Sequence, residues 1–377
     1  MKIASPHCGF SPESNSGGET YEREILKNLA RLGAQFEIIM AKGKLYSKDF
    51  PEFHIHEVAL TKGLRWYVAN WFWPHYLKKV ERSCNFDLLR IHSLRYTGPG
   101  VLWFNKQSKK KYPVVGHHHH IDPDLLNGLI EKNIIKKCDA LIVPSEFSKR
   151  QLMNQFGISD EKIHAVLNGV NQKYKPIPKS LELKYRLGLK DEKVLLFLGG
   201  LKKRKKVFFL IDVFLELLGQ FSDPLKLIIA GSGPLKSDLE RYVRHNEISE
   251  KVIFTGFIAE EEKILFYNLA DVFVFPSEME GFGFSPAEAM ACGKPVVVSN
   301  SGALPEVVEN ERNGFVVKNT THAFTQKILF LLQNERMAEL FGKSGAVRAK
   351  TIFQWPVAAR KMLGIYEELV NGAKRNK

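Results

Sequence analysis

Two carboxylates flank a glycine loop in the second half of the chain. Glu280 and Glu288 lie eight positions apart, with Gly281-Phe-Gly283 between them. Glycine lets a backbone approach a ligand closely, and a helix that starts after such a loop presents N–H groups that suit a phosphate. Carboxylates beside an anion site are suited to accept hydrogen bonds from hydroxyl groups. The segment therefore predicts a ligand that carries phosphate and sugar hydroxyls together.

The flanking residues predict a strand and a helix that hold this loop. Asp271-Val-Phe-Val-Phe-Pro276 is an apolar run ending at a proline, as a buried parallel strand does. Ser285 and Pro286 predict a helix start, with Ser at the N-cap and Pro at the first helical position. Ser285-Pro-Ala-Glu288 is also a capping box, which alone would explain Glu288 structurally. The strand–loop–helix context favours the binding role.

A basic loop follows a second apolar run, 194–198. Gly199-Gly200 leads into Leu201-Lys-Lys-Arg-Lys-Lys206. A cationic loop at the carboxyl end of a parallel strand faces the ligand crevice of such a sheet and can neutralise a diphosphate. The alternative is a solvated basic run, and the position at a strand–helix junction favours binding. Gly231-Ser-Gly-Pro234 is a weaker motif that also fits a tight turn.

Two motifs in the first half of the chain also follow strand-like segments. Gly17-Gly18 precedes an amphipathic helix over 19–32 and would place backbone amides at its N-terminus, with a flexible turn as the alternative. The run His117–His120 follows the strand at 113–115. In an extended chain alternate side chains point to opposite sides, so one imidazole enters a cleft while its neighbours pack or meet solvent.

The order of segments predicts two α/β domains. The first expected strand begins at Lys2-Ile-Ala, and the others are 36–40, 86–91, 112–115, 140–143, 194–198, 225–230, 252–255, 272–275 and 295–299. The expected helices are 19–32, 207–218, 235–245, 260–269, 286–291 and 304–308. The stretch from Val166-Leu-Asn-Gly-Val170 to Pro178 suits a linker. A chain of 377 residues is long enough for two domains, and a cleft between them is a common ligand site.

Composition limits the function classes. The net charge is +14, and residues 1–170 carry half of the excess, which favours phosphorylated ligands, nucleic acid or anionic lipid. Neither zinc-finger spacing nor an aromatic RNA-binding signature occurs, so we expect no nucleic-acid partner. Four scattered cysteines without a C-x-x-C pair predict reduced thiols and no zinc or disulfide framework. Without a signal peptide or a transmembrane-length apolar segment, the sequence predicts a cytoplasmic protein.

An aromatic segment predicts either membrane contact or a core helix. Arg65-Trp-Tyr-Val-Ala-Asn-Trp-Phe-Trp-Pro-His-Tyr-Leu-Lys-Lys79 has basic residues at both ends. Trp and Tyr suit membrane interfaces, and Lys and Arg favour anionic lipid. We expect loose membrane association through 66–79, including Trp71 and Trp73, with Lys106-Gln-Ser-Lys-Lys-Lys111 adding to a basic face. The alternative is a helix that packs its aromatic side chains in the core.

Together these motifs resemble the GT-B glycosyltransferases, specifically the retaining family-four group, over nearly the whole chain. The strongest element is Glu280-Gly-Phe-Gly-Phe-Ser-Pro-Ala-Glu288. The supporting elements are Gly17-Gly18, Asn168-Gly-Val170, Gly231-Ser-Gly-Pro234 and Phe353-Gln-Trp355. The resemblance implies an α/β fold of GT-B type: two Rossmann-like domains face a central cleft. The acceptor-side domain would be 1–170, completed by a crossing helix over 355–377, and the donor-binding domain would be 171–354.

The resemblance also implies roles for matched residues. Glu288 would bind the donor ribose, Glu280 the transferred sugar, and Lys205 the diphosphate. His119 aligns with the family's cleft histidine, although a one-residue shift would select His118 or His120. The implied catalytic residues are His119, Glu280 and Lys205, and the implied donor-binding residues are Gly17, Gly18, Lys205, Glu280, Phe282, Gly283, Phe284 and Glu288.

Two positions depart from the family's Gly-Arg-Leu-x-x-x-Lys-Gly pattern. The arginine falls on Gly200 and the last glycine on Lys206. Lys202, Lys203 or Arg204 would supply the missing charge, and the sequence leaves this choice open. His120 also stands where an acidic residue often follows the histidine.

The implied activity is retaining transfer of a sugar from a UDP- or GDP-sugar to a glycan or lipid-linked acceptor, without a metal or other cofactor. The expected location is cytoplasmic and peripheral on the inner face of the membrane. Two alternatives are a non-catalytic glycosyltransferase-like partner and an inverting GT-B enzyme or sugar-nucleotide epimerase. The glutamate pair disfavours the second, while the missing arginine leaves the first open.

Overall fold

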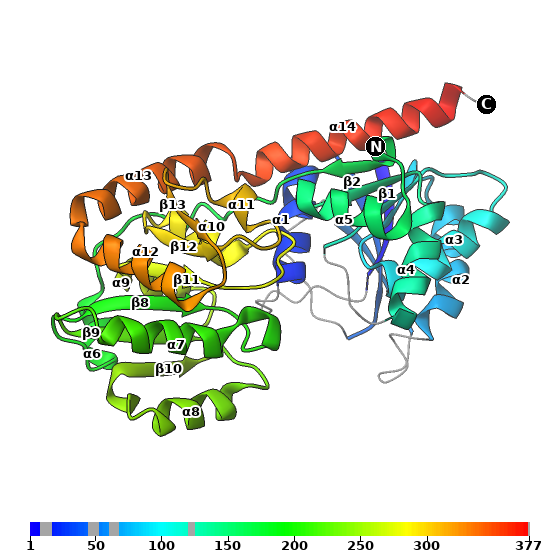
Figure 1. Ribbon diagram of the computed structural model, residues 1–377. Helices are drawn as coiled ribbons and strands as arrows, with labels where there is room; N and C mark the ends of the chain where they lie inside the picture. The colour runs from blue at the N-terminus through cyan, green and yellow to red at the C-terminus, as the bar shows by residue number, and fades with distance from the viewer. Residues whose placement is uncertain (8–16, 44–52, 60–67, 120–124, 376–377) are drawn as a thin grey trace. The chain divides into compact units, whose positions relative to one another are not determined.

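The chain folds into two compact α/β units (Figure 1). The computed structural model describes residues 1–7, 17–43, 53–59, 68–119 and 125–375. The first unit comprises Met1–Asn168 together with Trp355–Lys377, and the second comprises Gly169–Gln354. The domains expected from the sequence, 1–170 with 355–377 and 171–354, differ from these units by two residues at the first boundary.

The first unit contains a seven-stranded parallel sheet in the order β3-β2-β1-β4-β5-β6-β7. Its strands are β1 (Lys2–His7), β2 (Gln35–Ala41), β3 (Phe53–Val58), β4 (Leu88–Ile91), β5 (Val114–His117), β6 (Ala140–Val143) and β7 (Ile163–Ala165). Its helices are α1 (Gly17–Arg31), α2 (Ala69–Ser83), α3 (Leu94–Gln107), α4 (Leu125–Lys137) and α5 (Glu146–Phe156), with a 3₁₀ turn η1 (Asp160–Lys162). The apolar runs of the inner strands are buried, because helices cover both faces of a parallel sheet.

The second unit contains a six-stranded parallel sheet in the order β10-β9-β8-β11-β12-β13. Its strands are β8 (Lys193–Leu198), β9 (Leu225–Ala230), β10 (Val252–Gly256), β11 (Val272–Phe275), β12 (Val296–Ser299) and β13 (Gly314–Val317). Its helices are α6 (Leu181–Arg186), α7 (Val207–Leu218), α8 (Lys236–His245), α9 (Lys263–Leu269), α10 (Phe284–Ala291), α11 (Leu304–Val307), α12 (Thr321–Gln333) and α13 (Glu335–Thr351), with 3₁₀ turns η2 (Lys203–Lys205) and η3 (Ser249–Lys251).

The last helix, α14 (Trp355–Arg375), belongs to the first unit and packs against α1. Its inward face carries Met362 and Tyr366, both fully buried, together with other apolar side chains. The C-terminal segment therefore returns to the N-terminal unit, as expected for a crossing helix (Figure 1).

The predicted strands are present, with bounds that differ by two residues or fewer at each end. Three strands had not been predicted: β3, β7 and β13. β3 reads Phe-His-Ile-His-Glu-Val and lacks a continuous apolar run, because it lies at the edge of its sheet. β7 has only three residues, too few for a periodic pattern to stand out, and β13 begins with Gly314, a residue that is rare in strands.

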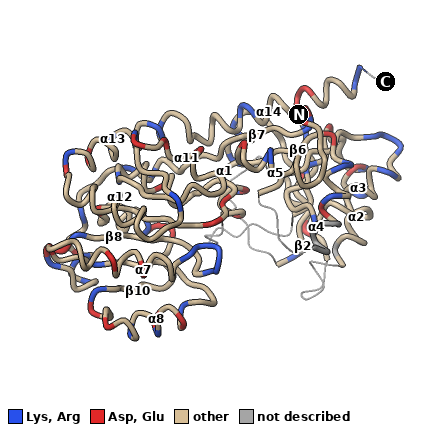
Figure 2. The backbone as a smooth tube through the Cα atoms, viewed as in Figure 1, with Lys and Arg blue, Asp and Glu red and all other residues tan. Residues whose placement is uncertain are grey.

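Lys and Arg are spread over both units rather than gathered in one segment (Figure 2). Within the described ranges, no helix combines the length and the apolar character that crossing a bilayer requires.

Candidate functional site

The basic loop and the glycine loop emerge at neighbouring strand ends in the second unit. β8 pairs with β9 on one side and β11 on the other, so the chain direction across the sheet switches between β8 and β11. Loops at the carboxyl ends of two such strands form the usual ligand site of an open α/β sheet. The loop after β8 holds Lys205, and the loop after β11 holds Glu280.

The basic loop folds as the 3₁₀ turn η2, and this turn decides which charges face inward. Lys205 is buried, whereas Lys202, Lys203 and Arg204 are exposed residues. Lys206 has φ 54 and ψ 42, a left-handed conformation in which glycine is unstrained. The last glycine of the family's Gly-Arg-Leu-x-x-x-Lys-Gly pattern falls at this position. Lys206 therefore keeps the backbone turn that the glycine would make, and only the side chain differs.

One carboxylate oxygen of Glu280 contacts three donor groups. Its Oε1 lies 2.5 Å from Lys205 Nζ and 2.8 Å from Arg204 Nη1, and accepts a 2.6 Å hydrogen bond from Ser277 Oγ. Arg204 also donates to the carbonyl of Met279 at 2.6 Å. Of the three residues left open for the missing arginine, the structure therefore selects Arg204 as the second cation beside Lys205.

Burial affects the pKa values of the charged groups in this cluster. The side chains of Lys205 and Glu280 are 11% and 10% exposed, and the ammonium lies over the Phe275 ring at 4.5 Å. Burial alone would raise the pKa of Glu280, but Lys205 and Arg204 outweigh it and hold that pKa below its usual value. Burial also lowers the pKa of Lys205, against the opposing effect of Glu280.

Helix α10 begins at Phe284, and the expected start at 285–286 is wrong. Gly283 is the N-cap residue, with φ 108 and ψ 65, and no side chain caps this end of the helix. Because Gly283 makes the turn, Ser285 and Pro286 lie inside the first turn, where a missing N–H costs no intrahelical bond. A Cβ at Gly283 would lie 2.8 Å from the Leu304 side chain, so close packing also requires glycine here.

Glu288 is a buried carboxylate rather than a capping residue. Its Oε2 accepts a 2.6 Å hydrogen bond from the hydroxyl of Tyr267 on α9. Burial raises the pKa of Glu288 to about 7, with a further increase from Glu260 that is opposed by Lys263. Because Tyr267 donates to Oε2, a hydroxyl donor would bind at the other oxygen, Oε1.

The Gly231-Ser-Gly-Pro234 turn packs against the basic loop. A Cβ at Gly231 would lie 2.0 Å from the carbonyl oxygen of Gly199, and one at Gly233 would lie 2.5 Å from that of Leu201. The Leu201 amide also donates to the carbonyl of Ser232 at 2.9 Å. These glycines hold the start of the basic loop in place, which agrees with the tight-turn interpretation.

In the first unit, the histidine run alternates as an extended chain should. The ring of His117 lies between two hydroxyls, with Nδ1 2.9 Å from Tyr21 Oη and Nε2 2.8 Å from Tyr366 Oη. His118 faces the other way, with Nε2 3.6 Å from a carboxylate oxygen of Glu131. His119 is half-buried and packs edge-on against Tyr21 at 4.3 Å between ring centroids. His117 and His118 are therefore held within the unit, and His120 lies outside the described residues.

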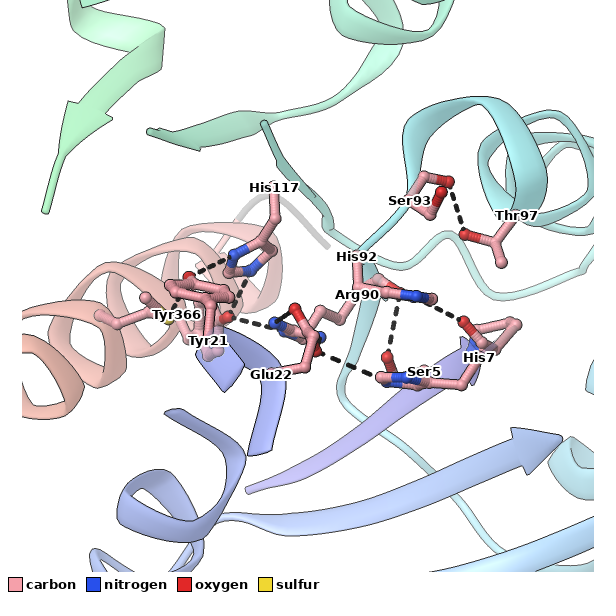
Figure 3. Close-up of polar contacts among 12 residues, drawn as sticks. Ser5, His7, Tyr21, Glu22, Arg90, His92, Ser93, Thr97, His117 and Tyr366 are labelled. Carbon is pink, nitrogen blue, oxygen red and sulfur yellow. Dashed lines mark hydrogen bonds and ion pairs between the residues drawn. The ribbon is translucent and has the colours of Figure 1, made fainter. Parts of the chain in front are cut away.

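A buried polar network surrounds His117 at the carboxyl ends of β1, β4 and β5 (Figure 3). Arg90 is fully buried and donates to both carboxylate oxygens of Glu22 at 2.8 Å, and to Tyr366 Oη at 3.3 Å. The ion pair keeps the pKa of Glu22 below its usual value despite burial. The network thus links β4, α1 and α14 through one compensated charge pair.

Two histidines in this network are neutral at pH 7. His7 and His92 stack with ring centroids 4.0 Å apart. Burial lowers the pKa of His92 to about 4 and that of His7 well below its usual value. Sequence reasoning missed Arg90, although a charged residue inside the apolar strand 86–91 was a usable signal. Nothing local connects it to Glu22 or Tyr366, which are 68 and 276 positions away.

The predicted residues fall into two groups, one in each unit. In the second unit, Lys205 and Glu280 are in contact, and the other donor-binding residues lie at or within the start of α10: Phe282, Gly283, Phe284 and Glu288. In the first unit, Gly17 and Gly18 are exposed at the start of α1, and His119 contacts Tyr21.

Comparison with known proteins follows the same division. Residues 15–174 match the family model for Glycosyltransferase Family 4, and residues 181–348 match the model for glycosyl transferases group 1. An uncharacterized glycosyltransferase of Methanocaldococcus jannaschii is 35% identical over 347 residues, covering 84% of this chain and 85% of that protein. The GDP-mannose-dependent alpha-(1-6)-phosphatidylinositol monomannoside mannosyltransferase of Mycolicibacterium smegmatis is 30% identical over 252 residues, covering 64% and 65%.

Among solved structures, the Anabaena protein HepE in complex with UDP and glucose matches 97% of this chain and 99% of its own. The TM-score is 0.78 and the identity 20%, which establishes the shared fold. The chain has two parallel-sheet Rossmann-like units. Two family models match it, and one relative is similar to it over most of that protein's length. The chain belongs to the GT-B glycosyltransferases of the group 1 and Family 4 type.

Proposed function

We propose that this glycosyltransferase is retaining and moves a sugar from a nucleotide-diphosphate sugar to a hydroxyl of a glycan or lipid-linked acceptor. The observation that carries the proposal is the cluster in which Lys205 and Arg204 share one oxygen of Glu280. One buried cation and one exposed cation beside a helix N-terminus suit a diphosphate. The carboxylate between them suits hydroxyl groups of the adjoining sugar.

The cluster supplies charge where the reaction needs it. In transfer, the bond between the anomeric carbon and the diphosphate breaks and its electron pair stays on the phosphate oxygen. A bond to the acceptor oxygen then forms at that carbon, and the proton of the acceptor hydroxyl passes to the departing phosphate oxygen. Cations already held in place stabilise the departing diphosphate more than the intact donor, and this difference accelerates the reaction. Lys205 and Arg204 take this role in our proposal, so transfer would need no metal ion.

Glu280 would exchange partners when the donor binds. Without a ligand, its carboxylate forms ion pairs with both Lys205 and Arg204. A diphosphate would compete for both cations and leave the carboxylate to accept hydrogen bonds from the sugar. Glu288 would take the ribose hydroxyls, and we propose His119 as a further residue for the transferred sugar. We propose a UDP- or GDP-sugar as the donor, in keeping with the GDP-mannose of one relative's name and the UDP bound to HepE.

Glu280→Gln is expected to lower transfer by about 10- to 100-fold, because hydrogen bonds to a charged group contribute about 1.5–3 kcal/mol. A screen of UDP, GDP and their sugars by calorimetry identifies the donor, and the anomeric configuration of the product is then read by NMR. Glu278→Gln is the matched control, since Glu278 is half-exposed in the same loop and pairs with Lys206 at 2.6 Å.

Each outcome of this screen is informative. Donor turnover with retained configuration, reduced in Glu280→Gln and unchanged in Glu278→Gln, supports the proposal. An inverted product would refute the retaining mechanism. Donor binding without turnover, for every donor and acceptor tried, would favour a non-catalytic partner.

We also propose that the first unit lies against an anionic membrane surface. Trp71, Phe72 and Trp103 form an aromatic patch on α2 and α3, and their side chains are exposed. Trp71 and Trp103 contact each other edge to face at 5.7 Å. The exposed stripe of α2 continues from Trp71 to Lys78 and Arg82 at helical spacing. Aromatic side chains beside cations complement the interface of an anionic bilayer.

The structure changes which tryptophans test this idea. Trp73 is 1% exposed, and its indole N–H donates to the carbonyl of Tyr96 at 3.1 Å, so it is a core residue. In the other basic segment, the Lys111 ammonium donates to three carbonyls at the end of α3, among them that of Lys106 at 2.7 Å, which is a structural role. Trp66 lies outside the described residues.

Trp71→Ser combined with Trp103→Ser is expected to weaken vesicle binding by at least about tenfold, from the apolar area that each indole buries. Sedimentation with phosphatidylglycerol vesicles measures the change, with phosphatidylcholine vesicles for comparison. Phe257→Ser is the control, because Phe257 is an exposed aromatic residue of the second unit. Equal binding of the double variant and the wild type would exclude this surface as the membrane contact.

A further inference from the structure

A cluster of potential metal ligands lies at the edge of the first unit, apart from the strand ends described above. Glu37 is on β2, His54 and His56 are on the edge strand β3, and Cys84 is the C-cap residue of α2. Glu37 is directly opposite His54 in the strand register, and His56 lies two positions further along the same face. Three separate segments therefore bring four side chains to one place.

The side chains are close enough to share one ion. Glu37 Oε2 lies 2.6 Å from His56 Nε2, and Glu37 Oε1 lies 3.1 Å from His54 Nδ1. One ligand atom from each of Glu37, His56 and Cys84 lies within 4.8 Å of the other two. Tetrahedral zinc, with bonds of about 2.0–2.3 Å, separates its ligands by roughly 3.3–3.8 Å. Small side-chain rotations would bring the three atoms to that spacing.

The charge balance of the cluster favours a cation. The Glu37 side chain is only 2% exposed, and its ion-pair partners among the described residues are the two histidines. A buried carboxylate needs a compensating charge, and within the described ranges no lysine or arginine forms an ion pair with Glu37. A divalent ion would supply it.

The position of the cluster favours a structural role. Glu37 and His54 lie in the amino-terminal halves of their strands, and Cys84 precedes β4. Ligand sites of open α/β sheets lie at the carboxyl ends. An ion here would tie the edge strand β3, which pairs only with β2, to the end of α2.

We propose that Glu37, His56 and Cys84 bind one divalent cation of the zinc class. The donor set of one nitrogen, one oxygen and one sulfur suits Zn²⁺ better than Mg²⁺ or Ca²⁺, which prefer oxygen alone. His54 holds the second carboxylate oxygen of Glu37 and orients it, as outer partners of metal ligands do. On binding, the Cys84 thiol loses its proton to solvent and the His56 proton moves to Nδ1, so affinity rises with pH.

The cysteine count predicted no zinc framework, and our proposal departs from that prediction. Spacing rules find sites in which paired cysteines or histidines lie close together in the sequence. Here the His54-Ile-His56 pair is visible, but Glu37 and Cys84 join it only through the sheet and the α2–β4 connection. The proposed ion takes no part in our proposed reaction.

Cobalt(II) is the probe that tests this site. Wild-type protein stripped with a chelator is expected to bind one equivalent and develop a thiolate-to-cobalt charge-transfer band. The histidine run at 117–120 contains no sulfur and cannot produce that band. Cys84→Ser is expected to lose the band, and Glu37→Gln to weaken binding at least tenfold. His322→Ala is the control, because its side chain is exposed in the second unit and it is expected to match the wild type.

Zinc provides a second readout that does not depend on the spectrum. One equivalent of Zn²⁺ is expected to raise the thermal midpoint of the wild type, since a ligand that binds only the folded state stabilises it. The same addition is expected to leave Cys84→Ser and Glu37→Gln unchanged, and circular dichroism confirms that both variants fold. The proposal is overturned if saturating cobalt gives the wild type no charge-transfer band, or if the band persists in Cys84→Ser.

Discussion

Lys205→Met is expected to lower sugar-transfer turnover by about 10²- to 10³-fold, the usual cost of removing one charge-stabilising donor from an active site. The Lys205 ammonium is buried, touches Glu280 at 2.5 Å and lies over the Phe275 ring. Methionine keeps the apolar stem against that ring but carries no charge. The departing diphosphate would then meet Arg204 alone.

The fold is expected to survive this change. Removing one partner of a buried ion pair commonly costs about 3–5 kcal/mol, because the other charge is left uncompensated. Here Arg204 and Ser277 still donate to the same oxygen of Glu280, so the loss should be smaller. Steady-state kinetics and urea denaturation of the same preparations separate the two effects.

A double-mutant cycle tests whether the two cations act together. Lys205 and Arg204 converge on one carboxylate oxygen, so we expect the double variant Arg204→Ala, Lys205→Met to lose less than the two single changes predict. Lys203→Ala is the control, since Lys203 is exposed on the same 3₁₀ turn. Wild-type turnover in Lys205→Met, with the donor saturating, would show that the ammonium does not stabilise the departing diphosphate.

The position of a buried strand could be predicted from the local sequence, but the start of helix α10 could not. The run Val272–Phe275 was predicted within its true bounds because a buried parallel strand is a short, continuous apolar segment. The start of α10 was placed too late because Ser-Pro is a common helix start, whereas the helix begins after Gly283, which has a positive φ and packs closely against Leu304.

Contacts between side chains were much harder to predict from the sequence. Lys202, Lys203 and Arg204 carry the same charge, and only the 3₁₀ turn determines that Arg204 reaches Glu280. The pair formed by Arg90 and Glu22 depends on how a strand and a helix meet in the folded unit. Residue types and loop positions therefore predicted that Lys205 and Glu280 belong to one site. The contact between these two side chains, and Arg204 as the third member of the site, could be found only from the structure.

Glu288→Gln is expected to stabilise the protein above pH 7 by up to about 3 kcal/mol, at 1.36 kcal/mol for each unit of pKa shift. Burial raises the pKa of Glu288 from its ordinary 4.5 to about 7. Between these values the folded state binds more protons than the unfolded state, so the wild type loses stability as pH rises through this window. Glutamine carries no charge at any pH and avoids that loss.

The same change is expected to weaken donor binding. An ionised Glu288 can accept hydrogen bonds from ribose hydroxyls while Tyr267 donates to its other oxygen. Glutamine keeps one acceptor and adds a donor, so we expect a loss of about 10- to 100-fold in nucleotide affinity. The wild type should also bind the nucleotide more weakly below pH 7, where Glu288 is protonated, whereas the variant should lack this dependence.

Opposite effects of one substitution on stability and affinity would identify Glu288 as a residue kept for binding, because burying its charge costs the fold. Urea denaturation at pH 5 and pH 8 measures the first effect, and nucleotide titration at the same two pH values measures the second. The surface variant Glu278→Gln should change neither by more than a few tenths of a kcal/mol. If Glu288→Gln lowers stability at pH 8, or binds the nucleotide as the wild type does, the buried carboxylate has a structural role and the ribose assignment fails.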